Sequence, residues 1–142
     1  MAKGKQPNIV LIMTDQHNRH VAGCYGDPIV QTPNLDSLAG GGVVFENAYC
    51  NYPLCAPSRM CFMSGREPYE IAAWANQSVL PSDTPTFAHA LGQVGYEVAL
   101  CGRMHFNGPD QRHGFQKRIF PEVSGYAVGG LTNTMKFERT SM

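Results

Sequence analysis

Apolar residues in this 142-residue chain gather in short runs that glycines and polar residues separate. Residues 8–13 form the first run, in which β-branched and other apolar side chains follow one another without alternation. Such a run is typical of a strand that is buried on both faces of a parallel sheet. Residues 43–49 and 96–101 have a similar composition. We therefore predict strands at these three places.

Helix signals lie between the predicted strands. Thr32 and Pro33 combine a typical N-cap residue with proline at the first helical position, and glycines at 40–42 end the helix. A later helix is expected to open at residues 82–85 and to stop at Gly95. The apolar side chains expected on one face of these two helices are, in chain order, Leu35, Leu38, Ala39, Phe87, Ala88, Leu91 and Val94.

A further helix is expected to start near Pro57. The predicted order is then strand, helix, strand, helix, helix, strand. Alternation of this kind favours an α/β fold in which neighbouring strands run parallel.

The length and net charge of the chain limit the classes of function that it can have. The chain is long enough for one domain with a core, and its 11 Lys and Arg residues balance its 11 Asp and Glu residues. A formal net charge of zero gives no reason to expect a nucleic-acid partner or an acidic membrane surface. The apolar run at 9–13 is too short for a signal-peptide core or a membrane span, so a cytoplasmic location is the default expectation.

The five cysteines form an odd set without a Cys-x-x-Cys pair. This pattern supports neither a disulfide framework nor a zinc site. A reducing compartment is the simpler expectation.

The segment 53–65 carries the first candidate chemistry. It contains Cys-x-Pro-Ser-Arg, followed by an apolar run that ends in Ser-Gly. Pro57 suits the first helical turn, so Cys55 is expected just before a helix N-terminus, where N–H groups and the helix dipole favour an anion. Arg59, one turn further, can make a two-pronged contact with sulfate-like oxygens. The spacing fits an anionic ester site.

Cys55 has two other interpretations. A cysteine is often a small buried apolar residue, and that alternative stays open. A phosphatase-type thiolate loop also pairs cysteine with arginine at a helix start, but it places the two residues further apart than Cys55 and Arg59. We therefore reject the thiolate loop.

Further polar candidates follow predicted strands. Asp15 comes directly after residues 8–13, and the block 102–115 follows the strand at 96–101. Ligand-binding groups of open α/β sheets collect beyond the carboxyl ends of the strands, so both are expected at the same rim as Cys55. For Asp15 a capping role in a turn is the alternative. Asn76 lies in a loop, where a turn-forming role is equally open.

The segment 53–65, the Thr-Pro-Asn-Leu-Asp-Ser-Leu-Ala block at 32–39 and the Gly-Arg-Met-His segment at 102–105 together resemble type I sulfatases. The continuation to His-Gly-Phe at 113–115 is most similar to the choline-sulfatase-like branch. The resemblance implies an alkaline-phosphatase-like, mostly parallel sheet flanked by helices, incomplete in this chain. Residues 1–120 would be the N-terminal part of the catalytic domain, and residues 121–142 a poorly defined tail.

For the nucleophile, the resemblance implies that Cys55 is oxidised to formylglycine (3-oxoalanine) by a formylglycine-generating enzyme. The hydrated aldehyde would attack sulfur and also bind a divalent cation, most simply Ca²⁺, with Mg²⁺ or Mn²⁺ as alternatives. Asp15 would be a metal ligand at the end of the first strand. Gln16 stands where many members have a second acid, and its amide oxygen is a candidate ligand.

For the substrate, the resemblance implies that Arg59 stabilises the charge that develops on the sulfate group. Arg103 stands in the place of the family's lysine and would hold a sulfate oxygen, although arginine cannot donate a proton as a lysine can. His105 would assist the leaving alcohol. Asn76 is the nearest match to a substrate-contacting asparagine.

The implied function is a sulfuric ester hydrolase that acts on a small sulfate ester. A phosphonate monoester or phosphodiester hydrolase of the same superfamily is the first alternative, and a truncated, non-catalytic protein is the second. The family's remaining metal ligands, an Asp followed by Asn or His, are not found in this chain. We therefore expect a fragment of the full enzyme, a short product, or a site completed by assembly with another chain; the oligomeric state stays open.

Overall fold

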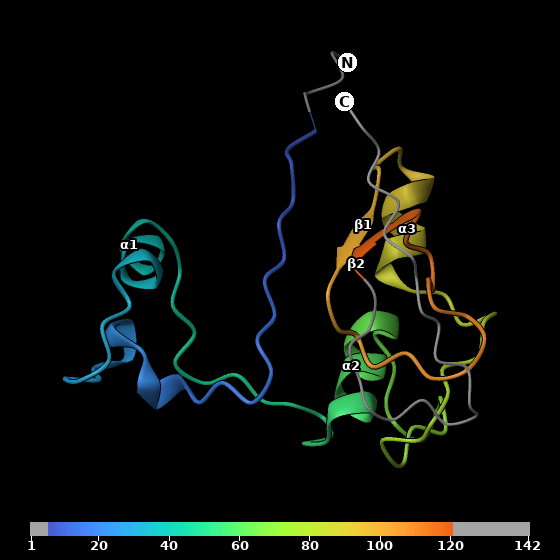
Figure 1. Ribbon diagram of the computed structural model, residues 1–142, viewed down its shortest axis with the longest axis horizontal. Coiled ribbons are helices and arrows are strands. Elements are labelled where there is room, and N and C mark those ends of the chain that lie inside the picture. Colours follow the sequence, from blue (N-terminus) through green and yellow to red (C-terminus); the bar gives the residue numbers. More distant parts are fainter. Residues whose placement is uncertain (1–5, 121–142) are drawn as a thin grey trace. The chain divides into compact units, whose positions relative to one another are not determined.

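The chain divides into two units, Met1–Tyr49 and Cys50–Met142, which are described separately. The computed structural model describes residues 6–120 (Figure 1). The tail predicted at residues 121–142 lies outside the described residues. No helix in the described part of the chain is long and apolar enough to cross a membrane.

The first unit contains two short 3-10 helices, η1 (Arg19–Val21) and η2 (Gly23–Tyr25), and one α-helix, α1 (Pro33–Gly41). α1 begins at the predicted proline and has Gly42 as its C-cap, so the local start and stop signals predicted it correctly. Its apolar face is nevertheless exposed, with Leu38 at 68%.

Side-chain hydrogen bonds attach α1 to η2. Asp36 accepts from the backbone of Cys24 at 2.7 Å and from the Thr32 hydroxyl at 3.0 Å, while the Thr32 hydroxyl accepts from Gly23 at 2.8 Å. A Cβ on Gly23 would lie 2.6 Å from an Asp36 carboxylate oxygen. The Thr-Pro-Asn-Leu-Asp motif therefore fastens a loop to a helix.

The strands predicted at residues 8–13 and 43–49 are wrong, because both segments are irregular in the structure. Val10 is 82% exposed and Ile12 is 77% exposed. A strand forms only when its N–H and C=O groups pair with a neighbouring strand, and no strand is described within residues 6–49. An apolar, β-branched composition indicates that a segment is suited to a strand, but it does not provide the neighbouring strand that the segment must pair with.

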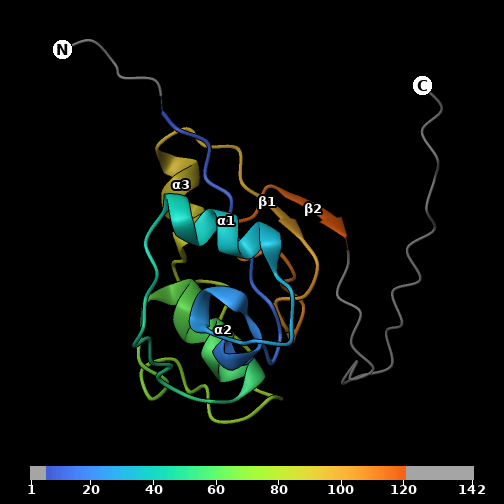
Figure 2. The same cartoon turned by 90° about the vertical axis from the view of Figure 1, so that its left-hand side faces the viewer.

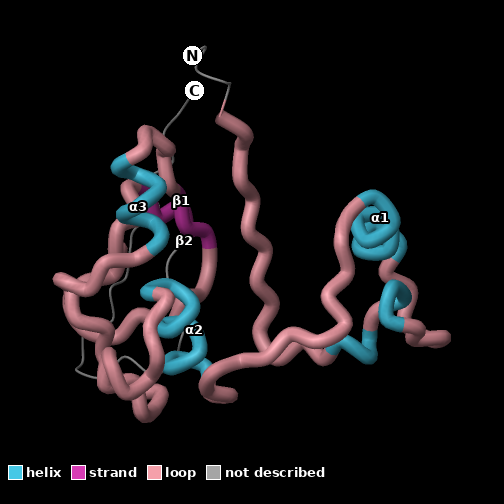
Figure 3. Tube along the Cα trace, turned by 180° about the vertical axis from the view of Figure 1, so that it is seen from behind, coloured by secondary structure: helices cyan, strands magenta, loops and turns pink. Residues whose placement is uncertain are grey.

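The second unit contains α2 (Cys55–Ser64), α3 (Phe87–Gln93), β1 (Ala99–Cys101) and β2 (Lys117–Phe120). α2 confirms the predicted helix, with Pro57 in the first turn and Gly65 in the left-handed conformation at its end. It begins at Cys55, however, which was predicted to lie just before the helix. Figure 3 shows that loops make up much of the rest.

The helix start predicted at 82–85 is wrong, because α3 starts later, with Thr86 as its N-cap. Thr86 and His89 form a capping box, in which each side chain meets the other residue's backbone N–H. This reciprocal pair satisfies two N–H groups at the helix start, so it overrides the Ser-Asp-Thr-Pro signal that precedes it. The strand predicted at 96–101 is confirmed only over 99–101.

β1 and β2 pair in parallel, with Ala99 opposite Lys117 and Leu100 opposite Arg118 (Figures 1 and 2). A bulge follows Leu100. The parallel pairing confirms the predicted strand direction in a sheet of two strands. Because parallel strands need a long connection, residues 102–116 form an extended loop, and this loop carries the second chemical block.

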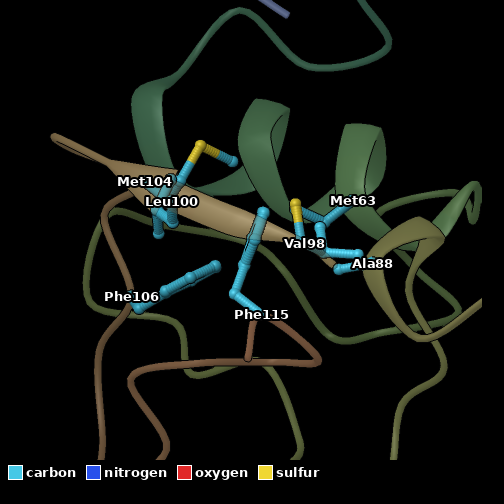
Figure 4. Packing of buried hydrophobic residues seen from close by; sticks show 7 residues of the cluster. All are labelled: Met63, Ala88, Val98, Leu100, Met104, Phe106 and Phe115. Carbon is cyan, nitrogen blue, oxygen red and sulfur yellow. The ribbon is translucent and has the colours of Figure 1, made fainter. Parts of the chain in front are cut away.

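Two apolar clusters lie in this unit. One contains Met63 of α2, Ala88 of α3, Val98 just before β1, Leu100 of β1, and Met104, Phe106 and Phe115 of the following loop (Figure 4). The other contains Ala56, Met60, Cys61, Ile71, Ala73 and Leu80. α2 contributes to both clusters, so it is buried on most of its circumference and is held firmly in place.

Gly114 is expected to be essential for the packing of the loop on α3. Its φ is +96°, and a Cβ there would lie 2.7 Å from both the His89 backbone N and its Nδ1 atom, which belong to the capping box. Gly114→Ala should lower the free energy of unfolding by about 2–3 kcal/mol, because backbone strain and a clash add together. Urea unfolding measures the loss.

Gly95→Ala is the matched control, since Gly95 has φ +92° but open space around a new Cβ. It should cost only about 1 kcal/mol. Equal losses in the two variants would show that the contact with His89 does not matter.

Candidate functional site

Cys55 is the first residue of α2, and its half-buried side chain is a thiol. The preceding Leu54 is extended and is the N-cap, although its side chain offers no acceptor to the helix. The first N–H groups of a helix have no partner within the helix and carry a partial positive charge. The observed start of α2 therefore places the Cys55 side chain where an anionic group is favoured.

Asn76 supplies the acceptor that Leu54 lacks. The Ala56 N–H donates to Asn76 Oδ1 at 3.0 Å. The structure thus brings Asn76 to the start of α2, next to Cys55, and shows a contact with the helix; its predicted contact with substrate stays a prediction.

Arg59 lies one turn into α2 and is buried, at 7% exposure. Its Nη1 donates to the Arg103 carbonyl oxygen at 3.0 Å and lies 4.0 Å from the Met104 sulfur. A buried guanidinium is destabilising unless oxygen acceptors satisfy it. This contact ties the signature helix to the loop after β1.

The Arg103 side chain contacts His105, with Nη2 and Nδ1 2.9 Å apart. Arginine stays protonated and has no acceptor, so Nδ1 of His105 is the acceptor and the neutral ring carries its proton on Nε2. His105 is 4% exposed and has φ +56°, a conformation that is uncommon outside glycine and often found at functional sites. Arg103 therefore orients His105 and sets its tautomer.

Cys61 differs from Cys55 in its surroundings. Cys61 is buried at 6% exposure, and burial first, then the nearby Glu67 and Cys50, raise the pKa of its thiol. A buried thiol with a raised pKa is unreactive. Of the two cysteines of α2, only Cys55 combines partial exposure with a helix start.

Asp15 and Gln16 belong to the first unit, where Gln16 has φ +52°. Their predicted roles as metal ligands stay predictions. Among the described residues, no group of three or more His, Cys, Asp or Glu side chains could hold a metal ion.

Two features of this region were not predicted from the sequence. Asn107 donates to two backbone carbonyls, of Asn76 and of Ser78; only its place directly after the Met-His-Phe segment could have drawn attention to it. Buried His113 lies 3.3 Å from Asp110, whose carboxylate also accepts from the backbone of Arg112 and His113.

The environments of Asp110 and His113 move both pKa values downward. Burial alone would raise the pKa of Asp110, but the backbone donors of Arg112 and His113 outweigh it. Burial lowers the pKa of His113 more than the Asp110 carboxylate raises it. The pair is therefore best described as a carboxylate beside a neutral imidazole near neutral pH.

Comparison with known proteins identifies relatives. The family model described as "Sulfatase" matches residues 7–136. Choline-sulfatase of Rhizobium meliloti (strain 1021) is 42% identical over 123 residues, which cover 87% of this chain and 24% of that protein.

Solved structures agree with this similarity. The structure of BT4656 in complex with its substrate D-glucosamine-2-N,6-O-disulfate matches with a TM-score of 0.75 and 38% identity, over 80% of this chain and 23% of that one. The phosphonate monoester hydrolase of Agrobacterium radiobacter matches with a TM-score of 0.72 and 25% identity, over 84% and 26% of the two chains. The present chain thus spans about a quarter of the length of these relatives.

The contact from Arg103 should be visible in the nitrogen resonances of His105. At about pH 8.5, well above the usual histidine pKa, Nδ1 should give the signal of an unprotonated nitrogen and Nε2 that of a protonated one. Arg103→Met should shift the Nδ1 resonance because a charged donor is lost, as measured by long-range ¹⁵N–¹H correlation. Arg66→Met, at an exposed arginine of the same unit, is the control. A proton on Nδ1 in the unmodified chain would contradict the assignment.

His113 should make stability depend on pH. Its folded-state pKa lies below the ordinary 6.5, so the unfolded chain takes up the proton first and stability falls as the pH drops from about 7 to 5. His113→Asn should flatten this fall in urea titrations, while His17→Asn, at an exposed histidine, should not. Asp110 titrates below its ordinary 3.8 and so acts outside this window. Equal slopes for the His113 variant and the unmodified chain would refute the expectation.

Proposed function

Because this chain belongs to the sulfatase family and has its alkaline-phosphatase-like α/β fold, we propose that it carries the nucleophile end of a sulfuric ester hydrolase site. The observation that carries this proposal is the start of α2. There Cys55 occupies the first helical position, while Arg59 connects the helix to the segment that holds Arg103 and His105. The activity of a whole enzyme, about four times longer in the relatives, is part of the proposal.

The nucleophile in this proposal is formylglycine formed from Cys55. When hydrated, this aldehyde supplies a hydroxyl group that can attack sulfur, and its return to the aldehyde releases sulfate; an unmodified thiol has no such route. The position of Cys55 suits the group, since its side chain is half-buried at a helix start.

The chain's own residues orient and stabilise the substrate in this proposal. The N–H groups and dipole at the start of α2 favour the negative charge of a sulfate ester. Arg59 and Arg103 add positive charge near the site. Arg59 is held by its hydrogen bond to the Arg103 carbonyl oxygen, and the Arg103 side chain is held by its contact with His105. Preorganised charge of this kind is most effective where charge develops in the transition state.

His105 is the proposed proton donor to the leaving alcohol. With Nδ1 accepting from Arg103, the proton resides on Nε2. An oxygen that leaves sulfur gains negative charge, and a donor aimed at it lowers the barrier. Arg103 thus acts mainly on His105, and a direct contact between Arg103 and a sulfate oxygen is a second proposed role.

A divalent cation, with Ca²⁺ as the first candidate, is the proposed metal. Asp15 and Gln16 offer hard oxygen atoms of the kind that Ca²⁺ prefers. They are too few for a complete site, and the described residues hold no larger cluster. We therefore assign no step of the reaction to the cation.

The substrate class of the proposal is a small sulfate ester. The structure of BT4656 carries a sulfated glucosamine as its substrate, and the relative from Rhizobium meliloti is named for choline sulfate hydrolysis. The similarity to a phosphonate monoester hydrolase favours one alternative, because sulfate and phosphonate esters share shape and charge. A truncated, non-catalytic chain is the other alternative.

Cys55 should be converted to formylglycine when the chain is produced together with a formylglycine-generating enzyme. Mass spectrometry should show an aldehyde in place of the thiol in the peptide that contains Cys55. Cleavage after Arg59 separates this peptide from the one that contains Cys61, so Cys61 is an internal control that should stay a thiol. An intact Cys55 beside an active maturation enzyme would argue for the non-catalytic alternative.

The same matured sample also serves to test turnover by this chain. It is incubated with an aryl sulfate and an aryl phosphonate, with Cys55→Ala as the blank. We expect no turnover above the blank by this chain alone, because it spans only about a quarter of the length of its relatives. Turnover of the phosphonate in preference to the sulfate would favour the phosphonate hydrolase.

A further inference from the structure

One side-chain amide makes two hydrogen bonds to the loop that carries Asn76. Asn107 donates from Nδ2 to the Asn76 carbonyl oxygen at 2.6 Å and to the Ser78 carbonyl oxygen at 2.9 Å. A primary amide has two N–H donors on this nitrogen, so both are used on the same loop. Asn107 is partly buried. Removing its amide would therefore leave the two carbonyl oxygens without this donor, at a greater cost in free energy than on an exposed surface.

Residues 74–78 also form a closed turn. The Ser78 hydroxyl accepts from the backbone of Trp74 and of Ala75, each at 3.0 Å, and the Ser78 N–H donates to the Ala75 carbonyl at 3.0 Å. The Tyr52 hydroxyl donates to the Trp74 carbonyl at 2.9 Å. The turn is thus internally fixed, and Tyr52 on one side and Asn107 on the other determine its position.

The turn presents Asn76 Oδ1 to the Ala56 N–H. Because an amide N–H only donates, the atom of Asn76 that faces it must be the oxygen, and this fixes the orientation of the side-chain amide. The first N–H groups of a helix usually donate this hydrogen bond to the side chain of the helix's own N-cap residue. Here the N-cap is Leu54, whose side chain cannot accept, and the acceptor comes from Asn76, 20 positions after Ala56 in the chain.

We propose that Asn107 is a positioning residue for the nucleophile: it holds Asn76 as a remote cap on the first turn of α2, which begins with Cys55. The proposal rests on the proposed function of Cys55. Asn107 acts through two successive hydrogen bonds, its own to Asn76 and that of Ala56 to Asn76. It thereby keeps the helix start ordered without taking part in the reaction. Neither Asn107 nor this use of Asn76 follows from the sulfate-binding roles expected for the site.

Hydrogen exchange of the Ala56 amide tests the proposal. In the unmodified chain this amide should be protected, and Asn107→Leu, which keeps the side-chain size but removes both donors, should accelerate its exchange roughly tenfold. The Cα chemical shift of Cys55 should move toward its unstructured value in the same variant. The Gly65 amide, bonded to the Cys61 carbonyl at the other end of α2 at 2.8 Å, should exchange as before.

Two further variants locate the effect. Asn76→Ala should accelerate Ala56 exchange to the same extent, and the double variant Asn76→Ala/Asn107→Leu should be no faster, since both changes break one chain of contacts. Asn51→Leu removes a comparable donor from an exposed asparagine that contacts Glu67 at 2.9 Å, and it should leave the Ala56 amide unchanged.

Several results would overturn the proposal. An unprotected Ala56 amide in the unmodified chain would do so even if every variant failed to fold. Equal acceleration at Ala56 and Gly65 in Asn107→Leu would show a general loss of stability. These measurements use the thiol form of the chain. If Cys55 is not converted to formylglycine, the proposed function fails but the exchange results at Ala56 still stand. If the exchange results contradict the role of Asn107, the proposed function of Cys55 is unaffected.

Discussion

The burial of one positive charge governs the arrangement of the second unit. Arg59 is almost fully buried, and its guanidinium donates to the Arg103 carbonyl oxygen. A hydrogen bond to a charged group contributes about 1.5–3 kcal/mol, and leaving such a group unsatisfied costs more. The chain therefore has to return to α2 after β1. That return places Met104 in the apolar cluster and joins Arg103 and His105 to the helix that begins with Cys55.

α2 can support this site because it is packed on most of its surface. Ala56, Met60 and Cys61 belong to one apolar cluster, and Met63 belongs to the other. A helix held between two clusters moves little, whereas the loops around it supply the groups that contact its start. This division of roles, with a rigid scaffold and functional loops, is common in binding sites.

Arg103 stands where the resemblance to type I sulfatases implied a lysine. The longer guanidinium reaches His105 Nδ1 and sets the tautomer of the ring. A second feature is the helix start itself, where Leu54 cannot cap and Asn76, anchored by Asn107, does so from a distant loop. In both cases a residue acts through a neighbour, so its effect depends on geometry that no local motif encodes.

The sequence by itself determined the elements whose signals are local. Thr32, Pro33 and the glycines after them predict α1, and Pro57 with Gly65 predicts α2, because capping and backbone preferences act within one helical turn. The motif around Cys55 and Arg59 also indicated the chemistry, since its residue types and spacing suit an anion. Tertiary structure alone decided which strand-like segments pair, the tautomer of His105 and the remote cap on α2. Residues 8–13 have strand composition without a described strand partner, while residues 117–120 pair with β1 despite a weak pattern. Strand pairing and hydrogen bonds between distant loops join residues far apart in the chain, so their formation depends on how the whole chain folds.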